Sequence, residues 1–263
     1  NARIIYLPKR GEMYENVRKK VKGIHYVVIA GGDGSFESAF NSPVLQKKTI
    51  GFFPLGAGNA YYSYFYKGKK FEYLKSKFPF HEVDLDILEV KWNGQKRLTT
   101  IFSIGMDADV IRYSSGRTKH GFLDYVKGAW RTMTQSKSAY NFRCIFDEKS
   151  EIIENCVTCT LGKVPWGGYA MRFLHGNVLP HDGKIHASFV NNIHASWSNK
   201  LVRSWALILS MMNISKPPLL DIKVGKLVVE SDDEFPIQAG GEYLGTTKKV
   251  EISIKRKQKV LMI

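Results

Sequence analysis

Two glycine-rich segments, each placed directly after an apolar run, constrain the fold of this chain most. The first is Gly31-Gly32-Asp33-Gly34-Ser35, which follows the β-branched run at residues 26–30. The second is Pro54-Leu55-Gly56-Ala57-Gly58-Asn59, which ends the apolar run at residues 49–54. Continuous apolar runs of this length are typical of parallel strands buried on both faces. The pattern therefore predicts two successive parallel strands that each end in a glycine turn.

The rest of the chain divides into two patterns. Helices are predicted at residues 36–40 and 59–66, and strands that alternate with helices favour an α/β arrangement. From about residue 82 short strands with turn punctuation follow, which is typical of a mostly antiparallel β domain. These strands are predicted at residues 83–90, 98–104, 141–146, 153–161, 184–190, 226–230 and 250–254, with helices at 122–133 and 198–212. We therefore predict domains at residues 1–82 and 83–263, with the last segment returning to the first domain.

The glycine turns suit a phosphate ligand. Glycine lets a backbone approach a ligand closely, and the helix that follows presents free N–H groups to an anion. Asp33 lies at the carboxyl end of its strand, where open α/β sheets place their ligands, and its carboxylate can accept a proton or help to hold Mg²⁺. The alternative is a plain turn with a solvated aspartate. The segments are neither a P-loop, which needs Gly-Lys-Ser/Thr, nor a GxGxxG fingerprint.

Charge and cysteine content bear on partners and compartment. The chain carries 39 Lys and Arg against 24 Asp and Glu, a net charge of +15. This charge fits nucleic acid, anionic membranes or phosphorylated small molecules, but a nucleic-acid partner would leave the paired glycine turns unexplained, so none is expected. Three cysteines cannot form a disulfide framework, which favours the cytoplasm. Cys156 and Cys159 lie three apart in a predicted strand and should face opposite sides, so no zinc or redox site is expected.

The paired turns resemble those of the diacylglycerol kinase catalytic-domain family, which includes bacterial lipid kinases and sphingoid-base kinases. Members carry Gly-Gly-Asp-Gly-Thr after one strand and Pro-Leu-Gly-Thr-Gly-Asn after the next, where this chain has residues 31–35 and 54–59. Further similarities follow in the family's order. The segments that carry them are residues 83–85, 103–110, 121–125, 167–168, 181–184 and 238–242.

The resemblance implies an α/β nucleotide-binding domain like that of NAD and diacylglycerol kinases, followed by a β-sandwich-like domain, with the active site between them. It implies that ATP supplies the phosphoryl group, that Mg²⁺ bridges it, and that a hydroxyl of a diacylglycerol-like lipid attacks. Asp33 would act as base or metal-coupled carboxylate and Glu242 as a second carboxylate on Mg²⁺ through water. Apart from the resemblance, Arg117 and Lys119 lie in a glycine-containing loop, where they could reach ATP phosphates or a lipid headgroup unless the loop is simply solvated. The implied nucleotide-binding residues are Gly31, Gly32, Gly34, Ser35, Gly56, Ala57, Gly58 and Asn59.

The chain also departs from the family at informative positions. Ala57 replaces a phosphate-binding Thr or Ser, and Ser38 stands where many members carry Glu, with Glu37 one residue earlier. Gly240 occupies the Asp position of the late Asp-Gly-Glu motif. The family's first strand and its phosphate loop are not found intact, so the first domain is expected to lack that strand.

Three functions remain open at this level. The first is a lipid kinase that works at an anionic membrane surface, cytoplasmic and peripherally attached, with a homodimer left open. The second is a catalytically weakened relative that binds nucleotide or lipid as a sensor, motivated by Gly240, Ser38 and Ala57. The third is a Gly-Gly-Asp-Gly kinase of a soluble substrate, as in NAD kinases and phosphofructokinases, which the second glycine turn and the β-rich second half disfavour.

Overall fold

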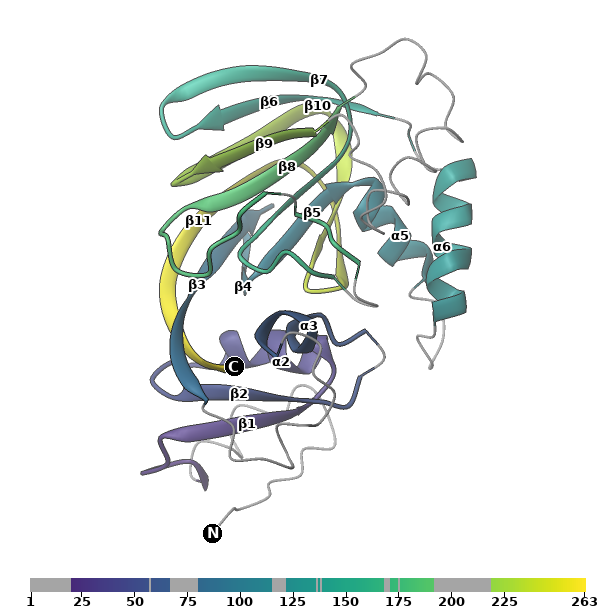
Figure 1. Cartoon of the computed structure of the whole chain (residues 1–263). Helices are drawn as coiled ribbons and strands as arrows, with labels where there is room; N and C mark the ends of the chain where they lie inside the picture. The colour runs from purple at the N-terminus through teal and green to yellow at the C-terminus, as the bar shows by residue number, and fades with distance from the viewer. Residues whose placement is uncertain are drawn as a thin grey trace.

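The computed structural model in Figure 1 describes residues 20–56, 58–66, 80–114, 122–135, 137, 139–167, 171–174, 176–191 and 219–263. The helix predicted at residues 198–212 and the segment at residues 7–11, which stands where the family's phosphate loop would be, lie outside these ranges. In the described ranges the chain is mostly β-strand, with few helices.

A parallel pair of strands opens the described chain. Strand β1 (Tyr26–Gly31) pairs in parallel with β2 (Thr49–Pro54), in a register that sets Gly31 beside Pro54. Helix α2 (Asp33–Phe40) begins two residues after β1 ends, and α3 (Ala60–Phe65) follows β2. Figure 1 shows both helices lying between this pair and the rest of the sheet. The predicted strands at 26–30 and 49–54 and both following helices are confirmed.

The remaining strands are antiparallel, except where β11 meets β2. The sheet has 11 strands, and its longest path runs β1-β2-β11-β10-β5-β7-β8-β9. Strands β3 and β6 join beside this path, β3 against β11 and β4, and β6 against β10 and β7. Their bounds are β3 His81–Trp92, β4 Gln95–Thr99, β5 Ile101–Gly105, β6 Tyr140–Phe146, β7 Lys149–Gly162, β8 Ile185–Asn191, β9 Leu219–Val224, β10 Lys226–Ala239 and β11 Glu242–Met262. Helices α5 (Met106–Ser114) and α6 (Phe122–Gln135) stand at one side (Figure 1).

Strand β11 joins the two regions of the sheet. Its first part pairs with β10, its middle and end pair with β3, and Val260 reaches Ile50 of β2 in parallel. Figure 1 shows β3 and β11 curving together from the antiparallel region down to β2. Two separate hydrophobic clusters lie at the two ends of the paired strands β3 and β11. One is centred on Phe36 and Phe52, and the other on Phe102 and Phe142. The predicted division near residue 82 stays a prediction, because the sheet is continuous there.

Several elements differ from their sequence-based prediction. The single strand expected at residues 98–104 is two strands, β4 and β5, because Thr100 turns its backbone N–H to the carboxyl of Glu37. Strand β9 and helix α5 were not predicted. Strand β10 continues past residue 230, through the exposed Asp232 and Asp233, by a register shift between Glu230 and Phe235. Two consecutive acidic residues would by themselves predict the end of a strand. The register shift lets both Asp232 and Asp233 face solvent while the strand continues.

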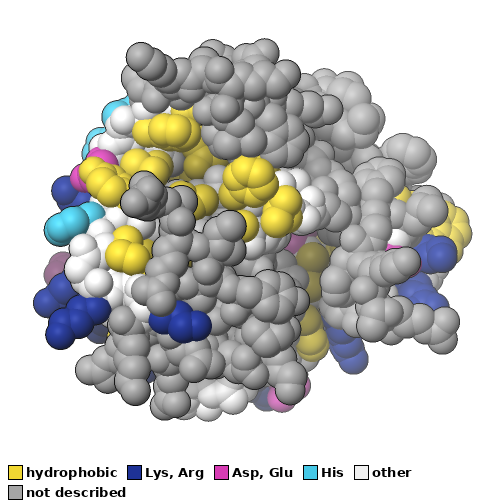
Figure 2. Space-filling model, turned by 90° about the horizontal axis from the view of Figure 1, so that it is seen from below, with side chains coloured by type: hydrophobic (Ala, Val, Ile, Leu, Met, Phe, Trp, Pro, Cys, Tyr) yellow, Lys and Arg dark blue, Asp and Glu magenta, His cyan; other side chains and the backbone are white. Residues whose placement is uncertain are grey.

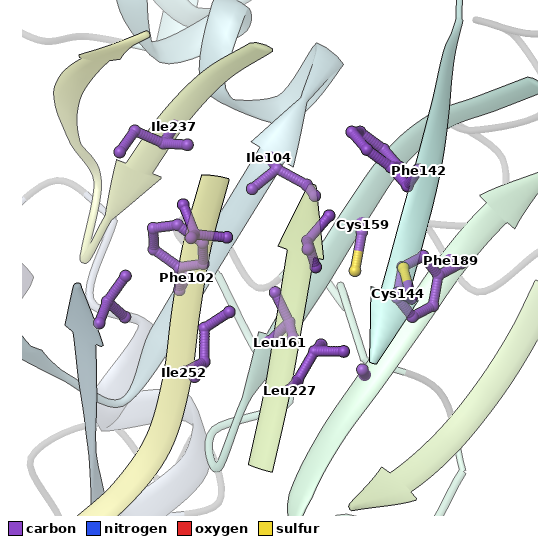
Figure 3. Close-up of a cluster of buried hydrophobic side chains, with 14 of the residues drawn as sticks. Phe102, Ile104, Phe142, Cys144, Cys159, Leu161, Phe189, Leu227, Ile237 and Ile252 are labelled. Carbon is purple, nitrogen blue, oxygen red and sulfur yellow. The ribbon is translucent and has the colours of Figure 1, made fainter. Parts of the chain in front are cut away.

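The prediction that Cys156 and Cys159 face opposite sides of a strand is also corrected by a register shift. Figure 3 shows Cys144 and Cys159 within the larger hydrophobic cluster, among Phe142, Phe189 and Leu161. Cys156 is buried in that cluster as well, since β7 shifts register between Cys156 and Thr158. The irregularity adds one residue to the spacing, so Cys156 and Cys159 do not face opposite sides. All three thiols are free and buried.

Candidate functional site

The two glycine turns lie against each other. A β-carbon on Gly56 would be 2.5 Å from the Cα of Gly32, and the N–H of Leu55 donates to the carbonyl of Gly31 at 2.9 Å. A β-carbon on Gly31 would be 2.8 Å from the side chain of Ser35. Because these approaches leave no room for a side chain, the glycines are required by packing between the turns as well as by any ligand.

Asn59 holds the second turn in shape. It adopts the left-handed conformation, with φ 49° and ψ 48°, which asparagine tolerates better than most residues. Its side-chain N–H donates to the carbonyl of Gly56 at 2.6 Å, and its Oδ1 accepts the N–H of Gly56 at 3.1 Å. The residue was predicted to bind nucleotide, and the structure gives it a turn-forming role. Gly58 lies in the same turn, while Ala57 lies outside the described residues.

Asp33 lies between the first turns of two helices. It is the first residue of α2, and its Oδ1 accepts the N–H of Tyr61 in α3 at 3.3 Å. Burial raises the pKa of Asp33, and backbone N–H groups of Ala60, Tyr61 and Asn59 only partly oppose this rise. A carboxyl in this setting accepts a proton readily and favours a cation beside it.

The N-terminus of α2 is open to an anion. Gly32 is the residue before the helix, and no side chain caps the first turn. The carbonyl of Gly32 accepts the N–H groups of Ser35 and Phe36, and the hydroxyl of Ser38 donates to the carbonyl of Gly34 at 2.7 Å. Free N–H groups at such a helix start, beside two glycine turns, are a suitable place for a phosphate group.

Glu37 is a residue that sequence reasoning did not place in the site. Its side chain is fully buried, one helical turn beyond Asp33. Its Oε1 accepts the N–H of Thr100 at 3.1 Å and the hydroxyl of Thr100 at 2.9 Å, and also the hydroxyl of Tyr61. Burial raises the pKa of Glu37. An acidic side chain at a helical i, i+4 spacing from Asp33 was the only available signal.

Glu242 is held by a different partner than expected. It begins β11, and its carboxylate accepts a hydrogen bond from Arg97 of β4 at 2.8 Å. About half of the Glu242 side chain is exposed. Before it, Gly240 and Gly241 form the turn between β10 and β11, both with positive φ. Arg117 and Lys119 lie outside the described residues.

The segment at residues 181–184 takes part in a buried ionic cluster. Lys163 is fully buried and lies 3.2 Å from Oδ2 of Asp86, and it also donates to Asp182. Burial tends to raise the pKa of Asp182, but hydrogen bonds from Lys163 and His186 overcome this and lower it to about 2. Asp182 in turn adds to burial in raising the pKa of Tyr64, in α3, to about 12. The cluster thus fixes this loop to Asp86 of β3 and to Lys163, which follows β7.

The residues present fit a nucleotide with a divalent ion. In the described ranges, no group of three or more His, Cys, Asp or Glu side chains could hold a metal by itself. Mg²⁺ in phosphoryl-transfer sites is held by one or two carboxylates together with phosphate oxygens and water. Asp33, half-buried beside the uncapped start of α2, is the carboxylate suited to this shared arrangement.

Comparison with known proteins relates the N-terminal segment of the chain to one family. Residues 2–86 match the model of the diacylglycerol kinase catalytic domain. No curated protein matches the sequence. The match supports the diacylglycerol kinase catalytic-domain family for this N-terminal segment, and the fold of the chain is shared with solved structures.

Solved structures from Bacillus anthracis str. Sterne share the fold. Three of them are named as diacylglycerol kinases, the first two only provisionally. The first is 13% identical with a TM-score of 0.70, and the match covers 99% of this chain and 86% of that one. The second is 15% identical with a TM-score of 0.67, covering 99% and 85%. The third is 14% identical with a TM-score of 0.64, covering 99% and 84%.

Proposed function

We propose that this protein transfers the γ-phosphoryl group of ATP to a hydroxyl of a diacylglycerol-like lipid, with Mg²⁺, at an anionic membrane surface. The observation that carries the proposal is the contact between the two glycine turns at the uncapped start of α2, with Asp33 beside them. The family match supports a kinase. The names of the Bacillus anthracis proteins support diacylglycerol as the substrate class.

The proposed reaction assigns one task to each part of the site. The phosphates lie against the glycine turns and the first N–H groups of α2, which stabilise their negative charge. The lipid hydroxyl attacks the γ-phosphorus, its oxygen–phosphorus bond forms as the bond to the β-phosphate oxygen breaks, and ADP leaves. Asp33 accepts the hydroxyl proton, for which its raised pKa suits it. Mg²⁺ supplies charge neutralisation between the phosphates when it is bound.

Helix α6 offers a surface for the membrane. Val126 and Trp130, one helical turn apart, are 46% and 63% exposed, and the adjacent Lys127 and Arg131 are also exposed. Figure 2 shows hydrophobic side chains beside Lys and Arg at the right-hand edge, the side on which α5 and α6 lie in Figure 1. Tryptophan is enriched at membrane interfaces, and each basic residue near an anionic surface contributes about 1 kcal/mol. None of the described helices has the length and apolar character that would cross a bilayer.

The test is transfer of labelled phosphate from ATP to lipids in mixed micelles. The panel holds diacylglycerol, monoacylglycerol, sphingosine, ceramide and undecaprenol, with NAD and fructose 6-phosphate as soluble controls. We expect labelled diacylglycerol, with a loss of at least about 10²-fold in Asp33→Asn. Asparagine keeps an oxygen that accepts the N–H of Tyr61, so this variant should fold. Asp232→Asn, at an exposed position on β10, is the matched control.

Sedimentation with vesicles tests the membrane surface separately. We expect binding to phosphatidylglycerol vesicles and weak binding to phosphatidylcholine vesicles, with the difference reduced in Trp130→Ala. Ile152→Ala, at an equally exposed apolar position on β7, should bind like the wild type. Equal loss in both variants would contradict a role for α6.

A second candidate function is a nucleotide or lipid sensor without transfer activity. It is favoured by Glu242, whose carboxylate is held by Arg97, and by Gly240, which brings no side chain to the turn. A protein that binds ATP but labels neither a lipid nor a soluble substrate would support the sensor and contradict the kinase. Label in NAD or fructose 6-phosphate would instead indicate a soluble substrate.

A further inference from the structure

Three oxygen atoms form a closed triangle behind the glycine turns. Oε1 of Glu37 lies within hydrogen-bonding distance of the hydroxyls of Tyr61 and Thr100, and these two hydroxyls lie within hydrogen-bonding distance of each other. The two hydroxyls carry one proton each, so they satisfy two of the three contacts. A neutral carboxyl at Glu37 supplies the third proton: the carboxyl donates to one hydroxyl, that hydroxyl donates to the other, and the second donates back to Oε1, so that all three contacts become hydrogen bonds.

The other carboxyl oxygen of Glu37, Oε2, also indicates that the carboxyl is neutral. Oε2 is buried and accepts no hydrogen bond among the described residues, because the nearby hydroxyl of Thr99, which slightly lowers the pKa of Glu37, donates to the carbonyl of Ile101 instead. An ionised carboxylate would leave part of its charge on this bare oxygen, which is costly away from water, whereas a neutral carboxyl leaves only an unpaired carbonyl. The orphaned oxygen and the triangle are independent observations, and both favour a neutral carboxyl at Glu37.

The turn after β10 leaves the space that this side chain fills. A β-carbon on Gly240 would lie 2.4 Å from Cγ and 2.7 Å from Cδ of Glu37. Gly240 has φ +56°, and its N–H donates to the carbonyl of Ile101 at 3.1 Å, which fixes the turn over the carboxyl. A side chain at position 240 and Glu37 in its present place are therefore mutually exclusive.

Tyr61 connects this triangle to Asp33. Its backbone N–H binds Asp33 while its hydroxyl binds Glu37, so one residue holds both carboxyls of α2. We propose that Glu37 is a protonated positioning residue, which acts through Tyr61 to hold Asp33 and the start of α3 in place, and that loss of its proton weakens nucleotide binding at the glycine turns. The proposal deepens the proposed function and rests on it for the identity of the nucleotide.

The charged groups around Glu37 are few. On its own helix the titratable neighbour is Asp33, and on α3 it is Tyr61. Burial and the nearby Glu37 both raise the pKa of Tyr61 above its ordinary value. On β4 and β11 the charges of Arg97 and Glu242 are paired with each other. Arg256 of β11 donates to the carbonyl of Phe40 at the far end of α2. No described cation pairs with Glu37, so ionisation would add an uncompensated buried charge one turn from Asp33, where it would repel phosphates.

Infrared spectroscopy tests the proton directly. The difference spectrum between the wild-type protein and Glu37→Gln should contain the carbonyl band of a neutral carboxylic acid at neutral pH. This band should give way to carboxylate bands as the pH rises. A difference spectrum with carboxylate bands alone at neutral pH would overturn the proposal, whether or not the protein is a kinase.

The pH dependence of ATP binding tests the positioning role. Wild-type affinity should fall on the alkaline side, while Glu37→Gln, which is neutral at every pH and still accepts the donors of Tyr61 and Thr100, should keep its affinity there. Gly240→Ala should displace Glu37 and lower affinity or transfer by about 10²-fold, as misplacement of a site group does. Gly241→Ala is the matched control, because Gly241 also has positive φ but nothing within 4 Å of its added β-carbon.

The outcomes separate the two proposals. An alkaline loss of affinity that persists in Glu37→Gln, or equal effects of Gly240→Ala and Gly241→Ala, would overturn the positioning role. Absence of lipid labelling together with the expected infrared band and ATP-binding profiles would remove the lipid kinase and leave the Glu37 inference standing, since neither measurement depends on transfer.

Discussion

The backbones of Gly32 and Gly56 touch, so that a β-carbon on Gly56 would lie only 2.5 Å from the Cα of Gly32. The contact joins the ends of two parallel strands and makes the paired glycine turns a single unit. It also means that a substitution at either glycine would disturb packing before it disturbed any ligand.

Gly56→Ala should therefore destabilise the protein. The clash is with backbone, which cannot rotate away, and overpacking of this kind costs about 1–3 kcal/mol. Urea unfolding followed by circular dichroism would measure the change. Leu55→Ala, in the same turn but 66% exposed, should change the free energy of unfolding by less than about 0.5 kcal/mol. Equal stability of Gly56→Ala and Leu55→Ala would contradict the close contact.

Lys163→Met should be among the most destabilising single changes in the chain. Lys163 and Asp86 are both fully buried, and removing the ammonium leaves the carboxylates of Asp86 and Asp182 facing each other without a cation. Loss of one partner of a buried ion pair costs about 3–5 kcal/mol. Lys255→Met removes an exposed lysine that pairs with Glu89 and should cost less than about 1 kcal/mol. Thermal unfolding of both variants would show whether the two costs differ.

Asp107 should give the stability of the protein a component that weakens as pH rises. Burial raises the pKa of Asp107 from 3.8 to about 6, against hydrogen bonds from Thr160 and Thr158 that lower it. The folded protein thus binds this proton more tightly than the unfolded chain. The resulting stability is fully present below pH 3.8 and is lost as pH rises toward about 6, by roughly 3 kcal/mol in all.

The free energy of unfolding would be measured for the wild type and for Asp107→Asn at pH values from roughly 3.5 to 7, a range that spans the two pKa values. The quantity to follow is the difference between the two proteins at each pH. The difference should slope in this window, because asparagine does not titrate. Asp232→Asn, at an exposed position, should leave the wild-type slope unchanged. A flat difference for Asp107→Asn would show that this carboxyl is ionised without cost.

The three cysteines should not react with thiol reagents in the folded protein. All are buried, and burial raises the pKa of Cys144 to about 12 and those of Cys156 and Cys159 further. The thiolate is the reactive form, and it is disfavoured at all three positions. Reaction with a chromogenic disulfide should be slow in buffer and should follow global unfolding as urea is added. A thiol that reacts rapidly in buffer would contradict the packing in Figure 3.

Local patterns predicted β1, β2 and the glycine turns. Contiguous β-branched residues at 26–30 favour a buried strand whatever surrounds them, and Gly31-Gly32 ends it. Local patterns failed at Thr100, which lies among good strand formers, because its departure from the ladder depends on the carboxyl of Glu37. They failed at Cys156 for the same reason, since a register shift depends on the partner strand.

The amino-acid sequence by itself therefore determined the paired glycine turns and the position of Asp33 at the end of a strand, because short-range spacing and backbone preferences specify both. Only the tertiary structure decided what those residues contact. In the folded protein Asp33 accepts the backbone N–H of Tyr61, and Glu242 accepts a hydrogen bond from Arg97. The side chain of Glu37 fills the space that a β-carbon on Gly240 would need. These contacts join residues far apart in the chain, and they follow from the way β11 folds back across the sheet, which no local pattern encodes.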